Sequence, residues 1–217
     1  MGEREKYIHN VGSLGIDAIK KMKFKDRKYV SNKIPELKNK KYFMVSLHPE
    51  TLKSNNSKLI SNVLRSLDNF QDYMKIFSYP NSDTNSAQIL MEIKKYVRAN
   101  NNAIATPSFG RIDYLHLLKY SEAIVGNSSS GILEAPYLGI PTIDIGKRQK
   151  GRSGGDSIFR SSPNVTSITA TIKRALESSV SKNNHIYEGK NSIKKVLNIL
   201  EKTELLDIKL KSFVDVR

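Results

Sequence analysis

Short apolar runs alternate along the chain with longer segments in which apolar residues recur every three or four positions. The runs, most of them followed by Gly, Pro or a polar cluster, are typical of buried strands, and the periodic segments are typical of amphipathic helices. The predicted strands are 42–47, 74–78, 102–105, 122–125 and 141–145. The predicted helices are 16–22, 55–70, 86–97, 112–119, 130–138, 168–178 and 191–201.

The order of these elements predicts an α/β fold. Strands that alternate with helices form a parallel sheet with helices on both faces, and ligands of such sheets bind beyond the carboxyl ends of the strands. Candidate chemistry should therefore follow a strand. The remaining stretches are read as loop at 1–15, a cation-rich surface or linker stretch at 23–41, and an amphipathic tail at 203–217.

Length and composition narrow the class of protein. A chain of 217 residues with 38% hydrophobic residues suits one domain, or one domain with terminal segments, and can bury a core. The absence of cysteine excludes a disulfide scaffold, a Cys-ligated zinc site and a thiol nucleophile, and it fits the cytosol. With no run of 18 apolar residues and no apolar signal segment after Met1, we expect a cytoplasmic protein without a membrane partner.

The net charge of +15 suits nucleic acid, an anionic lipid or a polyanionic substrate. The cations are mostly lysines scattered along the chain, whereas arginine is the usual base-reading residue. A solvated basic surface is therefore favoured over a nucleic-acid partner, although charge alone leaves both open.

The segment 126–131 (GNSSSG) carries the sharpest local signal, since it follows a predicted strand and opens a helix. The first N–H groups of a helix lack internal partners and the helix dipole is positive there, so small residues and hydroxyls at this point suit a phosphate. A plain serine N-cap is the alternative. The segment matches neither a P-loop, a dinucleotide fingerprint nor a nucleophile elbow.

Three further features follow predicted strands or the serine run. Glu134 lies one helical turn after Ser130 and suits two vicinal hydroxyls, or simply the helix dipole. The segment 146–152 (GKRQKGR) suits a diphosphate, or is an exposed basic loop. His48 could contact phosphate or transfer a proton, or be structural. No His, Asp and Glu have metal-ligand spacing, so we expect no metal.

Six motifs in order carry a family resemblance: 46–51 (SLHPET), 79–83 (YPNSD), 109–115 (FGRIDYL), 125–131 (VGNSSSG), 134–136 (EAP) and 145–152 (IGKRQKGR). Together they resemble the hydrolysing UDP-N-acetylglucosamine 2-epimerases, which begin sialic acid synthesis. The pair GNSSSG and GxRQxGR is the specific part. The opening 10–15 (NVGSLG) resembles the segment that joins the two domains of the family.

This resemblance implies a GT-B architecture of two Rossmann-like halves, about twice the length of this chain. The chain is similar to the carboxyl-terminal, nucleotide-binding half. The resemblance therefore implies an interdomain connector at 1–22, a UDP-binding Rossmann-like domain at 23–202, and a tail or crossover helix at 203–217. It also implies a missing amino-terminal half with most of the acid/base carboxylates, and a homodimer in the intact enzyme.

The resemblance also assigns roles to single residues. It implies that Ser128 and Ser129 hold the diphosphate, Glu134 the ribose hydroxyls, and Arg148 the nucleotide as a whole. His48 matches a histidine needed for catalysis and lies against the diphosphate. Further implied nucleotide contacts are Asn127, Ser130, Phe109 and Gly110, the last two in a loop whose backbone meets uracil. Residues expected in the cleft with less defined roles are Asn81, Asp83, Arg111, Gln149 and Arg152.

The implied reaction eliminates UDP from C1 after a base removes the C2 proton, and water then adds to give free N-acetylmannosamine. No cofactor is implied. The isolated chain is expected to bind UDP but to turn over poorly or not at all. Three alternatives stay open: the same chemistry on a UDP-diacetamido-trideoxyhexose, a GT-B glycosyltransferase donor domain, and a basic nucleic-acid-binding module.

Overall fold

The computed structural model describes residues 3–50, 56–81, 83, 85–180 and 186–203. Contacts within the chain divide it into two compact units. The terminal unit joins residues 1–22 with 187–217, and the sheet unit comprises residues 23–186.

A six-stranded parallel sheet forms the centre of the sheet unit. Its spatial order is β3 (Ala103–Thr106), β2 (Tyr73–Ser78), β1 (Lys41–Ser46), β4 (Ala123–Gly126), β5 (Thr142–Ile145) and β6 (Ile158–Ser161). This order, 3-2-1-4-5-6, is that of a Rossmann-like sheet, and it reverses direction between β1 and β4. The predicted α/β class with a parallel sheet is confirmed.

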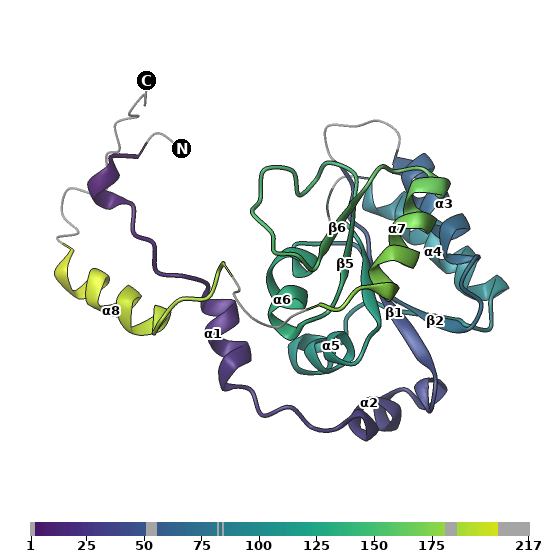
Figure 1. The fold of residues 1–217 in the computed structure, drawn as a ribbon, viewed down its shortest axis with the longest axis horizontal. Coiled ribbons are helices and arrows are strands. Elements are labelled where there is room, and N and C mark those ends of the chain that lie inside the picture. Colours follow the sequence, from purple (N-terminus) through teal and green to yellow (C-terminus); the bar gives the residue numbers. More distant parts are fainter. Residues whose placement is uncertain (1–2, 51–55, 82, 84, 181–185, 204–217) are drawn as a thin grey trace. The chain divides into compact units, whose positions relative to one another are not determined.

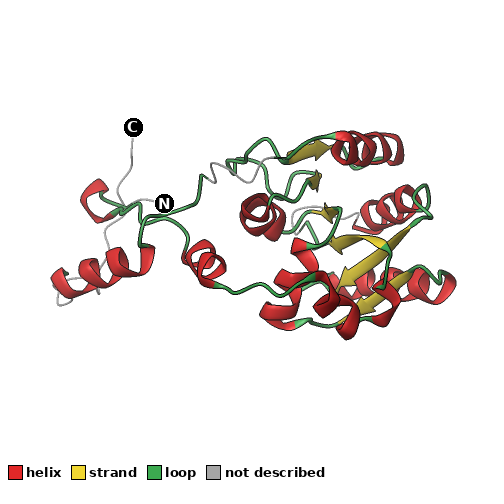
Figure 2. Ribbon diagram, turned by 60° about the horizontal axis from the view of Figure 1, so that its bottom comes forward, coloured by secondary structure: helices red, strands yellow, loops and turns green. Residues whose placement is uncertain are grey.

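Helices cover both faces of the sheet (Figures 1 and 2). One face carries α3 (Asn56–Leu67), α4 (Ser86–Ala99) and α7 (Val165–Glu177); the other carries α5 (Gly110–Lys119) and α6 (Ser130–Leu138). The main core lies under the first group, where Phe43, Val45 and Phe77 of the strands pack with Ile60 and Ile172 of the helices. Burial of these apolar side chains is the main force that holds the layers together.

Two elements of the sheet unit differ from the sequence-based expectation. Strand β6 was not predicted, because it is a short edge strand whose middle residue, Arg160, is exposed. Helix α2 (Arg27–Lys33) lies in the stretch read as surface or linker, and it buries only Val30. The Asp26 side chain accepts the Tyr29 N–H and caps this helix, a local signal strong enough to start a short polar helix. The same stretch contains a 3₁₀ turn, Pro35–Leu37.

The terminal unit brings together segments far apart in sequence. Helix α1 (Leu14–Lys21) packs with α8 (Ser192–Lys202), and the 3₁₀ turn Glu5–Tyr7 precedes them in the stretch read as loop. The Ser13 N–H donates to the Tyr187 carbonyl at 2.8 Å, and the Ser192 N–H donates to the Asp17 carboxylate at 2.8 Å. Of the predicted tail, residues 204–217 lie outside the described residues.

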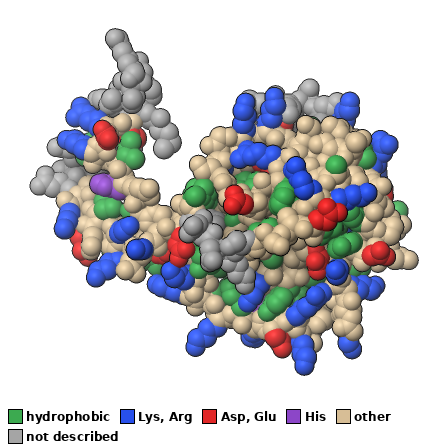
Figure 3. Space-filling model, viewed as in Figure 1, with side chains coloured by type: hydrophobic (Ala, Val, Ile, Leu, Met, Phe, Trp, Pro, Cys, Tyr) green, Lys and Arg blue, Asp and Glu red, His purple; other side chains and the backbone are tan. Residues whose placement is uncertain are grey.

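Basic side chains are spread over the surface rather than confined to one element. On the face that Figure 3 shows, Lys and Arg lie scattered among polar and apolar surface. This distribution is the one expected of a solvated surface. Within the described part of the chain, no helix is long and apolar enough to cross a membrane.

Candidate functional site

The candidate site lies at the carboxyl edge of the sheet, between β1 and β4. The chain leaves β1 toward α3 on one face and leaves β4 toward α6 on the other, so the two connections part and form a crevice. A cavity of about 400 Å³ opens there, within the size range of small-molecule sites. Its lining comprises Ser46, His48, Ser78, Tyr79, Asn81, Pro107, Ser108, Phe109, Gly110, Arg111, Tyr114, Ser128, Ser129, Ser130, Glu134 and Arg148.

The amino end of α6 forms one wall of this cavity. The residue before the helix, Ser129, makes no capping hydrogen bond with its side chain, so the serine N-cap left open by the sequence is not formed there. The Ser128 hydroxyl accepts the Ser130 N–H at 3.3 Å. Within the described part of the chain, the N–H groups of Ser128 and Ser129 have no acceptor. Unpartnered donors and the positive end of the helix dipole make this wall suited to an anion.

Gly126 allows the sharp turn between β4 and α6. Its φ of +148° is a backbone conformation that residues with a side chain rarely adopt. A Cβ at this position would lie 2.7 Å from the carbonyl carbon of Ser46 and closer still to its oxygen. The turn therefore requires glycine, and it places Asn127 so that its N–H donates to the Ser46 carbonyl at 3.1 Å.

The wall continues along α5 and α6. The Tyr114 hydroxyl of α5 donates to the Ser130 hydroxyl oxygen at 2.8 Å. Burial raises the pKa of Tyr114 to about 12, so the phenol stays a neutral donor. Glu134 lies half-buried on the same cavity, one helical turn after Ser130. This arrangement offers donors to an anion and, a few ångströms along the wall, a carboxylate acceptor for hydroxyl groups.

His48 lies two residues beyond the end of β1 and is 7% exposed. Its Nδ1 lies 3.4 Å from the Asn81 N–H, and its Nε2 lies 3.4 Å from the Ser46 hydroxyl. That hydroxyl in turn accepts a hydrogen bond from Ser78 at 3.1 Å. Because Nδ1 faces a donor, we assign the proton of the neutral imidazole to Nε2.

The electrostatic surroundings keep this histidine neutral. Burial lowers the pKa of His48, the positive charge of Arg148 lowers it further, and Asp83 raises it. The net direction is below the ordinary value, because a buried imidazolium next to a guanidinium is disfavoured.

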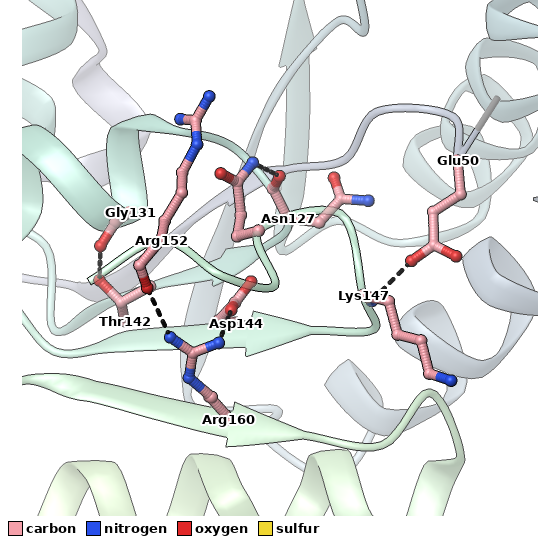
Figure 4. A network of polar contacts seen from close by, with 9 residues as sticks. Glu50, Asn127, Gly131, Thr142, Asp144, Lys147, Arg152 and Arg160 are labelled. Carbon is pink, nitrogen blue, oxygen red and sulfur yellow. Dashed lines mark hydrogen bonds and ion pairs between the residues drawn. The ribbon is translucent and has the colours of Figure 1, made fainter. Parts of the chain in front are cut away.

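Arg148 reaches the cavity from the loop after β5. Its Nη1 donates to the Asn127 carbonyl at 3.1 Å, and the neighbouring Gln149 donates its amide to the same oxygen at 2.7 Å. The start of the loop is held by the Glu50 carboxylate, which accepts the Lys147 N–H at 2.8 Å (Figure 4). This hydrogen bond holds the exposed Arg148 side chain at the crevice.

The structure brings most of the predicted site residues together. Those that line the cavity are His48, Asn81, Phe109, Gly110, Arg111, Ser128, Ser129, Ser130, Glu134 and Arg148. Asn127 and Gln149 are buried behind its wall and are 1% and 2% exposed. Asp83 acts on His48 through its charge, and Arg152 ends the basic loop, its carbonyl accepting from Arg160 at 3.0 Å.

Six lining residues were not among the predicted ones: Ser46, Ser78, Tyr79, Pro107, Ser108 and Tyr114. The first two end β1 and β2, so the rule that ligands bind beyond strand ends contained the signal for them. The role of Tyr114 depends on the packing of α5 against α6, which no local pattern shows. Among the described residues, no group of three or more His, Asp or Glu could hold a metal ion.

The fold and the site together define a Rossmann-like domain with a crevice at its switch point whose donors suit an anion. The family model described as UDP-N-acetylglucosamine 2-epimerase matches residues 1–201. The chain belongs to this family.

Two curated relatives support the assignment. One, from Campylobacter jejuni, is a GDP/UDP-N,N'-diacetylbacillosamine 2-epimerase (hydrolyzing), 36% identical over 166 residues, which are 76% of this chain and 43% of the relative. A UDP-N-acetylglucosamine 2-epimerase from Neisseria meningitidis is 33% identical over 186 residues, 81% of this chain and 46% of the relative. The chain spans less than half the length of both relatives.

A solved structure shares the fold. The Methanocaldococcus jannaschii UDP-GlcNAc 2-epimerase in complex with UDP-GlcNAc and UDP superposes with a TM-score of 0.65 and 15% identity, over 93% of this chain and 57% of that one. This likeness confirms the fold class implied by the resemblance, a Rossmann-like domain that forms one half of a GT-B architecture.

Proposed function

We propose that this chain holds the UDP moiety of a nucleotide sugar in a hydrolysing UDP-N-acetylglucosamine 2-epimerase. The observation that carries the proposal is the amino end of α6, where the N–H groups of Ser128 and Ser129 have no acceptor in the described structure and face a cavity with Arg148 and Glu134 on its walls. The diphosphate would receive hydrogen bonds from the N–H groups of Ser128 and Ser129. The ribose hydroxyls would donate to Glu134.

The proposed chemistry is removal of the C2 proton of the sugar, departure of UDP from C1 and addition of water, which gives free N-acetylmannosamine. Negative charge develops on the leaving diphosphate in the elimination step. Fixed backbone donors, the α6 dipole and the Arg148 guanidinium stabilise that charge without rearrangement, which is the electrostatic form of catalysis. His48 lines the same cavity as these groups.

A second sugar remains a candidate because one relative is named for it. The Campylobacter jejuni protein is a diacetylbacillosamine 2-epimerase, so the same reaction on a UDP-diacetamido-trideoxyhexose is the alternative. Both substrates share the UDP moiety. Product analysis with the full-length protein distinguishes them, since the released free sugars differ in mass.

We further infer that the proton transfers depend on an amino-terminal half, since both relatives are about twice as long as this chain. The terminal unit supports this inference. Helix α8 exposes Ile193, Leu197 and Leu200 on one side, at 43%, 53% and 58% exposure, and α1 exposes Leu14. These spacings of four and three residues form one apolar stripe, and such a stripe suits a partner domain. Residues 1–22 would then connect the two halves.

Calorimetric titration of the purified chain with UDP tests the proposal, with CMP and inorganic phosphate as competing ligands. We expect selective binding of UDP, lost in Glu134→Ala, weakened in Ser128→Ala and unchanged in Glu92→Ala, which removes a carboxylate of an exposed ion pair on α4. The chain alone should release little or no free sugar. Equal binding of UDP and phosphate, or insensitivity to Glu134→Ala, would contradict the assignment.

A further inference from the structure

Asn127 is a site residue whose polar groups all have partners inside the chain. It follows β4 and is 1% exposed. Its N–H donates to the Ser46 carbonyl at 3.1 Å. Its side-chain oxygen accepts the His48 N–H at 2.7 Å, and its side-chain nitrogen donates to the His48 carbonyl at 2.9 Å. Its own carbonyl accepts from Arg148 and Gln149. The side chain is therefore committed to the protein rather than to a ligand.

These bonds connect three neighbouring strand ends. His48 follows β1, Asn127 follows β4, and Arg148 lies in the loop after β5, and the three strands are adjacent in the order β1-β4-β5. The ladder between β1 and β4 ends at the pair Ser46 and Gly126. Beyond that pair, the Asn127 side-chain amide bonds to the His48 backbone as the backbone of a further strand residue would. It bridges the point where the connections of the two strands part.

Only a primary amide of this length fits the position. The His48 backbone offers one donor and one acceptor, and the Asn127 amide meets them with one acceptor and one donor. Aspartate would set a second acceptor against the His48 carbonyl, and alanine would leave two backbone groups without partners. Serine at the same place would be too short to reach both.

The ends of the basic loop are anchored independently of Asn127. At its start Glu50 accepts the Lys147 N–H. At its end Arg160 donates to the Arg152 carbonyl and lies 3.9 Å from the buried Asp144 carboxylate (Figure 4). A change in the Asn127 side chain should therefore leave the loop in place and act on what Asn127 itself holds.

From this geometry we propose that Asn127 is a positioning residue of the nucleotide site. Its side-chain amide fixes His48 at the cavity wall. The backbone carbonyl of Asn127, held in place by the same bonds, accepts from Arg148 and directs the guanidinium toward the crevice. It acts on a bound nucleoside diphosphate through these two residues and does not contact the ligand. The proposal rests on the function proposed above, but its first test needs no ligand.

The ligand-free test is amide hydrogen exchange at His48. In Asn127→Ala we expect exchange of the His48 N–H to be faster by about tenfold or more, because its acceptor is lost. Asn62→Ala is the matched control, since Asn62 likewise donates to a backbone carbonyl, that of Pro163, at an exposed position away from the site. Unchanged exchange at His48 in Asn127→Ala would overturn the positioning role, whatever the chain binds.

The functional test is UDP affinity in Asn127→Asp, which keeps the size and the acceptor and loses the donor. We expect affinity to fall by about tenfold, the usual effect of losing one charge-assisted contact. The fall should be much smaller in an Arg148→Ala background, since the contact between Arg148 and the diphosphate, through which the variant is proposed to act, is already gone. Additive losses, or wild-type affinity in folded Asn127→Asp, would overturn the proposal.

One measurement on the unaltered chain covers the case in which the variants do not fold. The side-chain amide protons of Asn127 should exchange slowly before UDP is added, and their NMR signals should shift little on addition. Amide protons that exchange freely and become protected only with UDP would mean direct contact with the ligand. No UDP binding by the unaltered chain would count against the proposed function and leave the His48 exchange test decisive.

Discussion

Substitution of Gly126 by alanine should strongly destabilise the sheet unit. The new Cβ would lie 2.7 Å from the Ser46 carbonyl carbon and closer still to its oxygen, so the backbones of β1 and β4 must separate by more than about 1 Å to reach an ordinary contact distance. The residue would also have to keep φ near +148°, a strain of about 1–3 kcal/mol.

The separation also breaks hydrogen bonds at the switch point. The Asn127 N–H would leave the Ser46 carbonyl, and the two bonds between the Asn127 amide and His48 would lengthen. At about 1 kcal/mol each, these losses and the strain sum to roughly 4–6 kcal/mol, against a total stability of about 5–15 kcal/mol for a domain. The midpoint of thermal unfolding should fall by roughly 10–20 °C.

Two glycines serve as controls in thermal and urea denaturation followed by circular dichroism. Gly151 has φ of +85° and open space around its Cβ, so Gly151→Ala isolates the strain and should cost about 1–2 kcal/mol. Gly155 has neither constraint, and Gly155→Ala should change stability by about 0.5 kcal/mol at most. If Gly126→Ala costs no more than Gly151→Ala, the close approach of β1 and β4 is not as described.

Three further outcomes are expected. Lys75 is fully buried, its amine has no partner in the described structure, and burial lowers its pKa. Lys75→Met should therefore raise the free energy of unfolding at pH 7 by about 1–3 kcal/mol in urea denaturation. A lower free energy of unfolding in this variant would contradict the reasoning. Burial also lowers the pKa of His48, so below about pH 6.5 the unfolded chain takes up a proton that the folded chain refuses. The free energy of unfolding should thus decrease as the pH is lowered from 7.5 to 5.5, and it should decrease less in His48→Gln. Equal decreases in the two proteins would show that His48 is not the cause. Tyr114→Phe removes the hydrogen bond to Ser130. It should weaken UDP binding a few-fold in calorimetry and lower the free energy of unfolding by about 1 kcal/mol. Unchanged UDP affinity would show that Tyr114 has no role in the site.

Strands β1 and β5 show where the sequence predicts well, at a buried apolar run. Residues 41–46 and 142–145 are buried along nearly their whole length, so hydrophobicity alone marks them. Strand β6 escapes because it lies at the sheet edge and holds Arg160 in its centre. Helix α2 is not predicted because its sequence is mostly polar and its one buried residue, Val30, gives no periodic signal.

For the site, the sequence reveals which residue types could bind a ligand but not which side chains bond to one another. The helix-opening serines and Glu134 are recognisable because their spacing along one helix is local. The bonding of Asn127 to His48 joins residues 79 positions apart, and only the fold brings them together. For the same reason Gln149, grouped with the cleft residues by its motif, proves to be buried behind the wall with its amide on the Asn127 carbonyl.

The most direct test of the central claim, that UDP binds at the amino end of α6, is an NMR titration of the isotope-labelled chain with UDP. The largest shifts should occur at the backbone amides of Ser128, Ser129 and Ser130, with smaller ones at His48 and in the loop that carries Arg148. Inorganic phosphate at equal concentration should shift the serine amides less. Shifts spread over the lysine-rich surface and equal for both ligands, with the serine amides unmoved, would contradict the claim.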